Sequence, residues 1–273
     1  MQNQITRWVK NHSVLTFLSL TFASSWIIQI PLALQEQGFL RTHIPFAVHT
    51  LSAYGPMLAA LLVTGALDGR AGIKELVGRM TRWRVHYIWW LFAVTPLMVA
   101  GLTTIVNGLV QGEGVSLSAI GRIDFLPDLG IGAVIFWVVT FGLGEETGWR
   151  GFLLPRLQQD RSNLIATFIL WLIWALWHLP LFFYSYDVSM LPGFLMGLLA
   201  GAINFTWLYN STGESILLVA VFHGLFNTAT ACSACKTGII APVVSVAVMI
   251  WAVLLVVFFK PVDLSMFRFK FGR

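Results

Sequence analysis

Charge is scarce in this sequence. Asp, Glu, Lys and Arg make up only 11% of the 273 residues, whereas 57% are hydrophobic, and there are only two cysteines. A soluble domain carries roughly 25% charged residues. The low charge therefore excludes an ordinary soluble globular domain, and two cysteines cannot supply all the ligands of a structural zinc site built from thiolates alone. Internal repeats, low-complexity stretches and a soluble appendage are also missing.

Long apolar runs are abundant, and several reach the roughly 20 residues that are needed to cross a hydrocarbon core about 30 Å thick. In lipid, every backbone polar group must be satisfied within a helix or a closed barrel, and continuous runs of Leu, Ala and Gly favour helices. We therefore predict an all-α polytopic membrane protein, a bundle of about eight transmembrane helices that forms a single domain over residues 1–273. The predicted spans are 14–34, 47–66, 87–110, 129–157, 163–184, 191–209, 215–235 and 239–259.

Basic residues alternate between loops and indicate the orientation. If the N-terminus is cytoplasmic, thirteen Lys and Arg lie inside, three lie outside and one, Arg150, lies within a helix. This excess follows the positive-inside rule and predicts that both termini are cytoplasmic. The inside residues are Arg7, Lys10, Arg70, Lys74, Arg79, Arg82, Arg84, Arg156, Arg161, Lys260, Arg268, Lys270 and Arg273; the outside residues are Arg41, Arg122 and Lys236. The formal net charge of +5 then reflects topology and attraction to anionic lipid headgroups, and no nucleic-acid partner is expected.

The two cysteines, Cys232 and Cys235, form a CxxC pattern at the outer end of the seventh predicted span. This spacing is typical of a redox pair or of half a metal site. Because no second pair accompanies it, we predict two ordinary small residues at a helix end.

Ionisable side chains inside spanning helices are the most informative feature, because each costs about 2.5 to 3.5 kcal/mol on insertion scales and usually has a partner in the bundle interior. His49, early in the second span, is expected only to extend its polar end to the interface. The other candidates are Glu145, Glu146, Arg150, His178 and His223, with Asn227 as a neutral polar neighbour.

The stretch GLGEETGWRGFL places two glutamates and an arginine on the fourth span. Glu146 and Arg150 are four residues apart, so they can pair along one face of a helix, while Glu145 points about 100° away. His178 lies about 22 Å into the fifth span at 1.5 Å per residue. Glu145 reaches that level only if the fourth helix continues to about residue 157, so we predict this longer helix.

One carboxylate, two imidazoles and a carboxamide on three helices can together activate a water molecule and stabilise an oxyanion. In this hypothesis Glu145 is the base, His178 holds and polarises the water, and His223 and Asn227 donate to the oxyanion. Alternatively, Glu145, His178 and His223 are three ligands of a catalytic Zn²⁺ with water in the fourth position. The HExxH zinc-protease motif is absent from the sequence.

At these residues the sequence resembles the CPBP family, the CAAX-protease and bacteriocin-processing group of intramembrane proteases, which includes Rce1-type prenyl-protein endopeptidases and Abi proteins. The EExxxR motif corresponds to Glu145, Glu146 and Arg150, and the HxxxN motif to His223 and Asn227. The FxxxH motif corresponds to His178, with Trp174 in the aromatic position. The resemblance covers residues of about 130–230, whereas the helices within 14–110 match only in spanning the membrane.

The resemblance implies endoproteolysis of a membrane-embedded or lipid-modified peptide or protein, such as a prenylated CaaX protein. Glu145 and His178 would then activate water, His223 and Asn227 would support the oxyanion, and Glu146 with Arg150 would brace the site. Family members are described either as glutamate proteases or as metalloproteases; we expect water activation without a metal, with Zn²⁺ as the alternative. We expect an integral, multi-pass protein of a prokaryotic plasma membrane. The rival hypotheses are a proton- or ion-coupled transporter, which also places carboxylates and histidines near the midplane, and a non-catalytic immunity or scaffold protein.

Overall fold

The computed structural model describes residues 4–112, 122–232, 235 and 238–258. Over these residues all the regular secondary structure is helical and there is no strand, which confirms the predicted all-α class. The longer helices are α1 (Gln4–Asn11), α2 (Ser13–Glu36), α3 (Gly55–Met80), α4 (Tyr87–Ala93), α5 (Thr95–Gln111), α9 (Asn163–Trp177), α10 (Leu191–Ser211), α11 (Ile216–Ala231) and α13 (Ile240–Phe258). Three 3-10 turns, η1 (Phe46–Tyr54), η4 (Leu179–Phe183) and η5 (Val188–Met190), precede or follow them.

The helices are apolar enough for a multi-pass membrane protein. In the described part of the chain, five of them are long and apolar enough to cross a membrane, or six if the bent pair α4 and α5 forms one span. These segments overlap six of the eight predicted spans. The other two predicted spans correspond to the 16-residue α11 and to the interrupted helix over residues 132–157, so the count of eight is not confirmed.

The third predicted span bends by 53° between α4 and α5. Pro96 lies in the first turn of α5 and has no amide hydrogen, and its ring excludes the carbonyl of Phe92 from an ordinary helical bond. The hydroxyl of Thr95 donates to that carbonyl instead, at 2.7 Å. A proline inside the apolar run therefore accounts for the bend that the hydropathy pattern alone does not predict.

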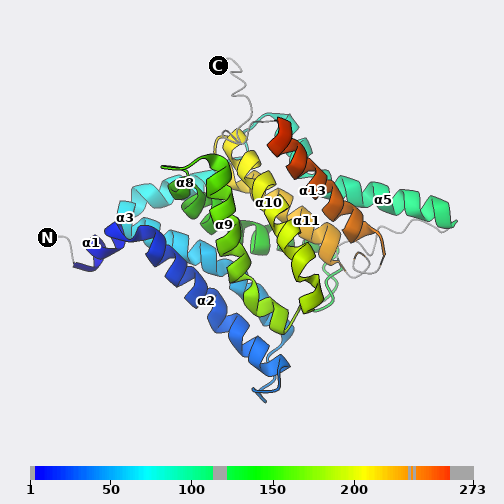
Figure 1. The fold of residues 1–273 in the computed structure, drawn as a ribbon, viewed down its shortest axis with the longest axis horizontal. Helices are drawn as coiled ribbons and strands as arrows, with labels where there is room; N and C mark the ends of the chain where they lie inside the picture. The colour runs from blue at the N-terminus through cyan, green and yellow to red at the C-terminus, as the bar shows by residue number, and fades with distance from the viewer. Residues whose placement is uncertain (1–3, 113–121, 233–234, 236–237, 259–273) are drawn as a thin grey trace.

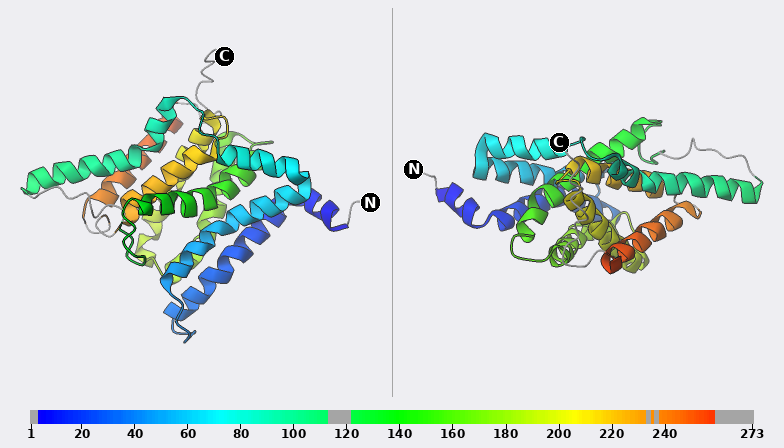
Figure 2. Two further views of the ribbon diagram at one scale, coloured as in Figure 1. Left: turned by 180° about the vertical axis from the view of Figure 1, so that it is seen from behind. Right: turned by 90° about the horizontal axis from the view of Figure 1, so that it is seen from above.

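The fourth predicted span forms one interrupted helix that reaches Leu157, which confirms its predicted length. Seen from behind in Figure 2, this green helix crosses the centre of the molecule between α11 and α3. It alternates between α-helical and π-helical stretches: α6 (Gly132–Trp137), η2 (Val138–Leu143), α7 (Gly144–Gly148), η3 (Trp149–Leu153) and α8 (Leu154–Leu157). π-Helical stretches are rare in proteins, and those that occur are often located at functional sites.

Glycines let the neighbouring helices approach this central helix closely. A Cβ atom at Gly142 would collide with the carbonyl oxygen of Ala220 on α11. A Cβ atom at Gly144 would lie 2.7 Å from the carbonyl oxygen of Ala53 on η1. The segment that carries Glu145 is therefore held between α11 and η1 by direct backbone contact.

The remaining helices pack around this centre. In Figure 1, α2 and α3 lie side by side on one side of the molecule, and α10 and α13 on the other. Helix α9 packs against α10, and α11 contacts α5, α10 and α13. The family-like helices 132–157, α9 and α11 thus occupy the middle of the bundle.

The predicted orientation concerns several residues outside the described ranges. Lys236, Lys260, Arg268, Lys270 and Arg273 all lie there. The cytoplasmic location of both termini stays a prediction from the charge pattern.

The prediction for the two cysteines is wrong. Cys232 and Cys235 form a disulfide at the C-terminal end of α11. The helix ends at Ala231 and Cys232 is extended, with φ −68° and ψ 151°. This departure from the helix leaves the two Cα atoms 5.0 Å apart, within the range that a disulfide spans.

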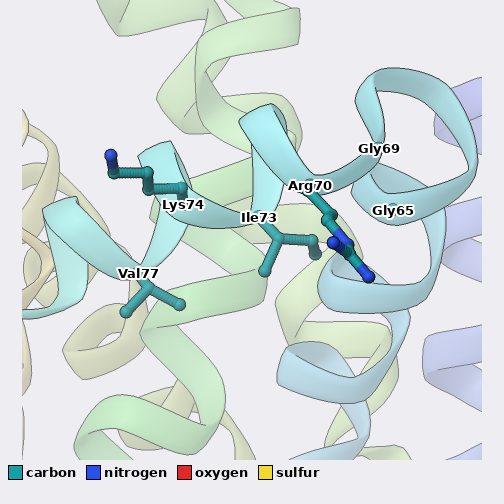
Figure 3. A pocket seen from close by; sticks show the side chains of 6 residues that line it. All are labelled: Gly65, Gly69, Arg70, Ile73, Lys74 and Val77. Atoms are coloured by element: carbon teal, nitrogen blue, oxygen red, sulfur yellow. The ribbon is translucent and has the colours of Figure 1, made fainter.

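A surface cavity of about 500 Å³ lies along α3 where this helix bends. The bend is at Gly69, whose φ of +59° is a left-handed conformation that favours glycine. Figure 3 shows Arg70, Ile73, Lys74 and Val77 on the helix that follows the bend. None of the predicted site residues lines this cavity, so it is separate from the site described next.

Candidate active site

Glu145 lies in the interior of the bundle, on the short α-helical stretch α7. Only 2% of its surface is exposed. The indole nitrogen Nε1 of Trp174, on α9, donates a hydrogen bond to Glu145 Oε2 at 2.8 Å. The prediction that this carboxylate faces the bundle interior is therefore confirmed.

Trp174 occupies the centre of the candidate site. Its ring lies 5.5 Å from the ring of His178 and 5.8 Å from the ring of His223, measured between centroids. The guanidinium carbon of Arg150 lies over the same ring at 4.7 Å. Trp174 thus brings residues of three helices together, including Glu145 and His178, although the latter two share no direct hydrogen bond in the structure.

Glu146 and Arg150 form the predicted pair along one helix face. Arg150 Nη1 lies 2.8 Å from Glu146 Oε2 and donates to Oε1 at 3.1 Å. Both side chains are fully buried, and the guanidinium also lies over the ring of Phe205 at 4.8 Å. A buried ion pair of this kind needs excellent geometry to offset the cost of desolvation, and the flanking aromatic faces add cation–π attraction.

His223 contacts this pair, which the sequence did not indicate. Its Nδ1 lies 2.9 Å from Glu146 Oε1, and 7% of its surface is exposed. Glu146 therefore accepts from Arg150 on its own helix and pairs with His223 on α11. With Nδ1 engaged, Nε2 is the nitrogen of His223 that can face a substrate.

His178 caps the C-terminal end of α9 and is half-buried. Its Nδ1 lies 2.7 Å from the carbonyl oxygen of Trp174. Because a carbonyl oxygen only accepts, Nδ1 carries the proton, and Nε2 of the neutral ring is left as an acceptor. The backbone thus sets the tautomer that can take a proton from water.

Asn227 lies on α11, one turn beyond His223, and is half-buried. Residues four apart on a helix share a face, so the structure retains the predicted alignment of these two side chains.

The prediction that His49 extends its polar end to the membrane interface is wrong. His49 is 8% exposed, and its Nδ1 lies 2.6 Å from the hydroxyl of Tyr184. The reason is that η1 turns into the bundle, where the ring of Phe46 stacks on that of His49 at 5.5 Å.

The zinc alternative requires Glu145, His178 and His223 to converge on one ion. Among the residues that the structure describes, no group of three or more His, Cys, Asp or Glu side chains is arranged to hold a metal ion. Of the three predicted ligands, Glu145 accepts from Trp174 through Oε2, and His178 and His223 use Nδ1 for contacts with a carbonyl and a carboxylate. These contacts leave Nε2 of both histidines available, as is usual for histidines that bind a metal.

The fold and the site together define a class: a multi-pass helical membrane protein that encloses a carboxylate and two imidazoles between its central helices. Comparison with known proteins shows which family the central segment is similar to. Residues 127–229 match the family described as type II CAAX prenyl endopeptidase Rce1-like, and this segment includes all the candidate site residues named above except His49. The resemblance expected from the three motifs is confirmed, since residues 127–229 are similar to this CAAX protease family.

A curated relative agrees with the family match. The chain is 34% identical over 113 residues to CAAX prenyl protease 2 of Methanococcus maripaludis. The aligned region covers 38% of this chain and 40% of that protein. The chain therefore spans less than half of the length of this relative.

Proposed function

We propose that this protein is an intramembrane endopeptidase that hydrolyses a peptide bond of a membrane-associated protein or peptide. The observation that carries the proposal is the buried Glu145 carboxylate, bonded to Trp174, whose ring also contacts both His178 and His223. A buried carboxylate next to two imidazoles is suited to proton transfer during hydrolysis.

In the proposed reaction, Glu145 accepts a proton from a water molecule that His178 Nε2 also polarises. The water oxygen attacks the carbonyl carbon of the substrate and forms a tetrahedral oxyanion. Asn227 donates to this oxyanion through its amide, and His223 donates through Nε2 when that nitrogen carries a proton. The C–N bond then breaks, and Glu145 returns the proton to the departing amine.

Glu146 and Arg150 brace this arrangement without touching the reacting atoms. Glu146 holds Nδ1 of His223, and Arg150 offsets the negative charge of Glu146. The orientation of His223 toward substrate then depends on this buried pair, in the way that outer carboxylates orient catalytic imidazoles.

The proposed substrate is apolar near the reacting bond, because aromatic rings surround His178. Phe194 contacts the ring of His178 at 5.2 Å and also contacts Phe182 and Tyr186. Prenylated CaaX-type proteins are one class that fits, and the name of the Methanococcus relative supports this class. We place the protein in a prokaryotic plasma membrane.

Replacing His178 tests the proposal. His178→Asn is expected to lower the rate of reporter-peptide cleavage about 100-fold or more, because an asparagine amide can still donate to the Trp174 carbonyl but offers no basic nitrogen. The measurement is cleavage of a fluorescent peptide by purified protein in liposomes.

His178→Ala is the comparison variant. The same large loss in both variants assigns the effect to the missing Nε2. If His178→Asn cleaves as fast as the unchanged protein, His178 serves only to end α9, and the proposed water activation is wrong.

Metal removal provides a separate test. We propose that water activation needs no bound metal, so dialysis against a strong chelator is expected to leave the cleavage rate within about twofold of the untreated sample. A loss of activity that added Zn²⁺ restores, measured in the same liposomes, would instead support the zinc alternative.

A further inference from the structure

The turn that carries His178 forms hydrogen bonds with residues outside the family-like segment. Between Trp177 and Tyr184 the chain leaves α9, passes through His178 and forms the 3-10 turn η4. We call residues 177–184 the His178 turn. Its position decides where Nε2 of His178 points.

The N-terminal helix α2 satisfies a carbonyl that this turn leaves free. The amide of Leu181 bonds to the carbonyl of His178 instead of that of Trp177, because the chain has tightened from an α-helix to a 3-10 turn. The indole Nε1 of Trp26, on α2, donates to the carbonyl of Trp177 at 3.1 Å. A buried carbonyl without a partner costs free energy, so Trp26 stabilises the turn in this position.

The other end of the turn is held by two more hydrogen bonds. His49 Nδ1 lies 2.6 Å from the hydroxyl of Tyr184, and Gln37 Nε2 donates to the carbonyl of Phe183 at 2.9 Å. His49 lies on η1, and Gln37 follows α2 directly. Three donors or acceptors from residues 26–49 therefore contact both ends of the His178 turn.

Helix α2 also fixes η1, so the contacts form a continuous chain. Ser25 donates to the carbonyl of Ser52 at 2.8 Å, and Gln29 Nε2 donates to Ser52 Oγ at 3.1 Å. Ser52 Oγ in turn donates to the carbonyl of His49 at 2.7 Å. Ser25, Gln29 and Ser52 are buried, so water does not compete strongly for these bonds.

We infer that Trp26 and the His49–Tyr184 pair are positioning residues, which hold the His178 turn so that Nε2 of His178 meets water beside Glu145. This inference rests on the proposed function and extends it to residues before 127, where the family match begins. The N-terminal helices are then part of the catalytic geometry and not only a membrane anchor.

The test uses two variants that each remove one donor or acceptor and keep an aromatic side chain: Trp26→Phe and Tyr184→Phe. Each is expected to lower kcat by about tenfold with KM within about twofold, because a small displacement of a catalytic group affects the chemical step more than substrate binding. In lipid nanodiscs, hydrogen–deuterium exchange in peptides covering residues 178–187 is expected to become faster in both variants.

Trp171→Phe is the matched control. Trp171 is also half-buried, lies on α9 two turns before His178 and donates to the carbonyl of Leu195 at 3.1 Å, toward α10 and not toward α2. This variant is expected to leave kcat and the exchange of residues 178–187 unchanged.

The hydrogen–deuterium exchange measurement tests this inference independently of the proposed function. Unchanged exchange at residues 178–187 in both variants overturns the inference, even if the protein is a protease. Faster exchange with an unchanged kcat also overturns it, because the turn would then move without consequence for catalysis. If the unchanged protein cleaves no peptide, the proposed function fails, and the exchange data alone decide whether α2 and η1 hold the turn.

Discussion

Glu145→Gln is expected to lower peptide cleavage about 1000-fold, since glutamine keeps the size of the side chain but cannot take a proton from water. Its amide oxygen can still accept from Trp174 Nε1, which donates to Glu145 at 2.8 Å. The contacts of Trp174 with His178 and His223 therefore remain. The measurement is the cleavage rate of the reporter peptide in liposomes, together with a thermal unfolding curve that shows the variant to be folded.

Glu75→Gln is the control for this result. Glu75 is an exposed glutamate on α3, 3.9 Å from Arg79, and the same change there is expected to leave cleavage unaffected. Full activity of Glu145→Gln would refute Glu145 as the base, whereas an unchanged protein that cleaves no peptide would favour the transporter or scaffold hypotheses.

The apolar runs predicted the helices well because a spanning helix must satisfy its backbone within itself, so its existence depends on local sequence. The extension of the fourth helix to Leu157 was also predictable, from the need to bring Glu145 level with His178. The π-helical interruptions and the 53° bend were not predicted. The former depend on close contacts such as Gly142 with Ala220, which involve residues far apart in the chain.

In the candidate site, too, contacts within one helix could be predicted from the sequence, whereas contacts between helices could not. The Glu146–Arg150 pair follows from a spacing of four residues on one helix and was predicted. The bond of His223 to Glu146 joins residues 77 positions apart, and no local spacing indicates it. The sequence did mark Trp174, as the aromatic residue four positions before His178, but its hydrogen bond to Glu145 depends on how α9 packs against the central helix.

The errors at His49 and at the cysteines have a common cause. Both predictions used position within a span: His49 near its beginning, Cys232 and Cys235 near its end. The structure shows that η1 turns inward and that α11 stops at Ala231, and these local departures from a straight helix decide what the side chains contact.

Arg150→Met is expected to cause the largest loss of stability of any single change discussed, because it leaves the charge of Glu146 buried with only His223 as a partner. Removing one member of a buried ion pair typically costs about 3 to 5 kcal/mol. In the described part of the chain, Arg150 Nε and Nη2 have no hydrogen-bond partner, so the attraction to Glu146 is the main polar compensation for burying this cation. The measurement is the free energy of unfolding in mixed detergent micelles.

The double variant Glu146→Gln with Arg150→Met separates the two roles of this pair. It removes both buried charges, so most of the lost stability is expected to return. Cleavage is expected to stay low, since Nδ1 of His223 then faces a neutral amide and its ring is no longer held by a carboxylate. If the double variant regains both stability and cleavage, the pair only compensates its own charges, and bracing His223 is not its function. If Arg150→Met has the same free energy of unfolding as the exposed-site variant Glu75→Gln, then Glu146 and Arg150 are not an isolated buried pair. Water or lipid headgroups must then reach them.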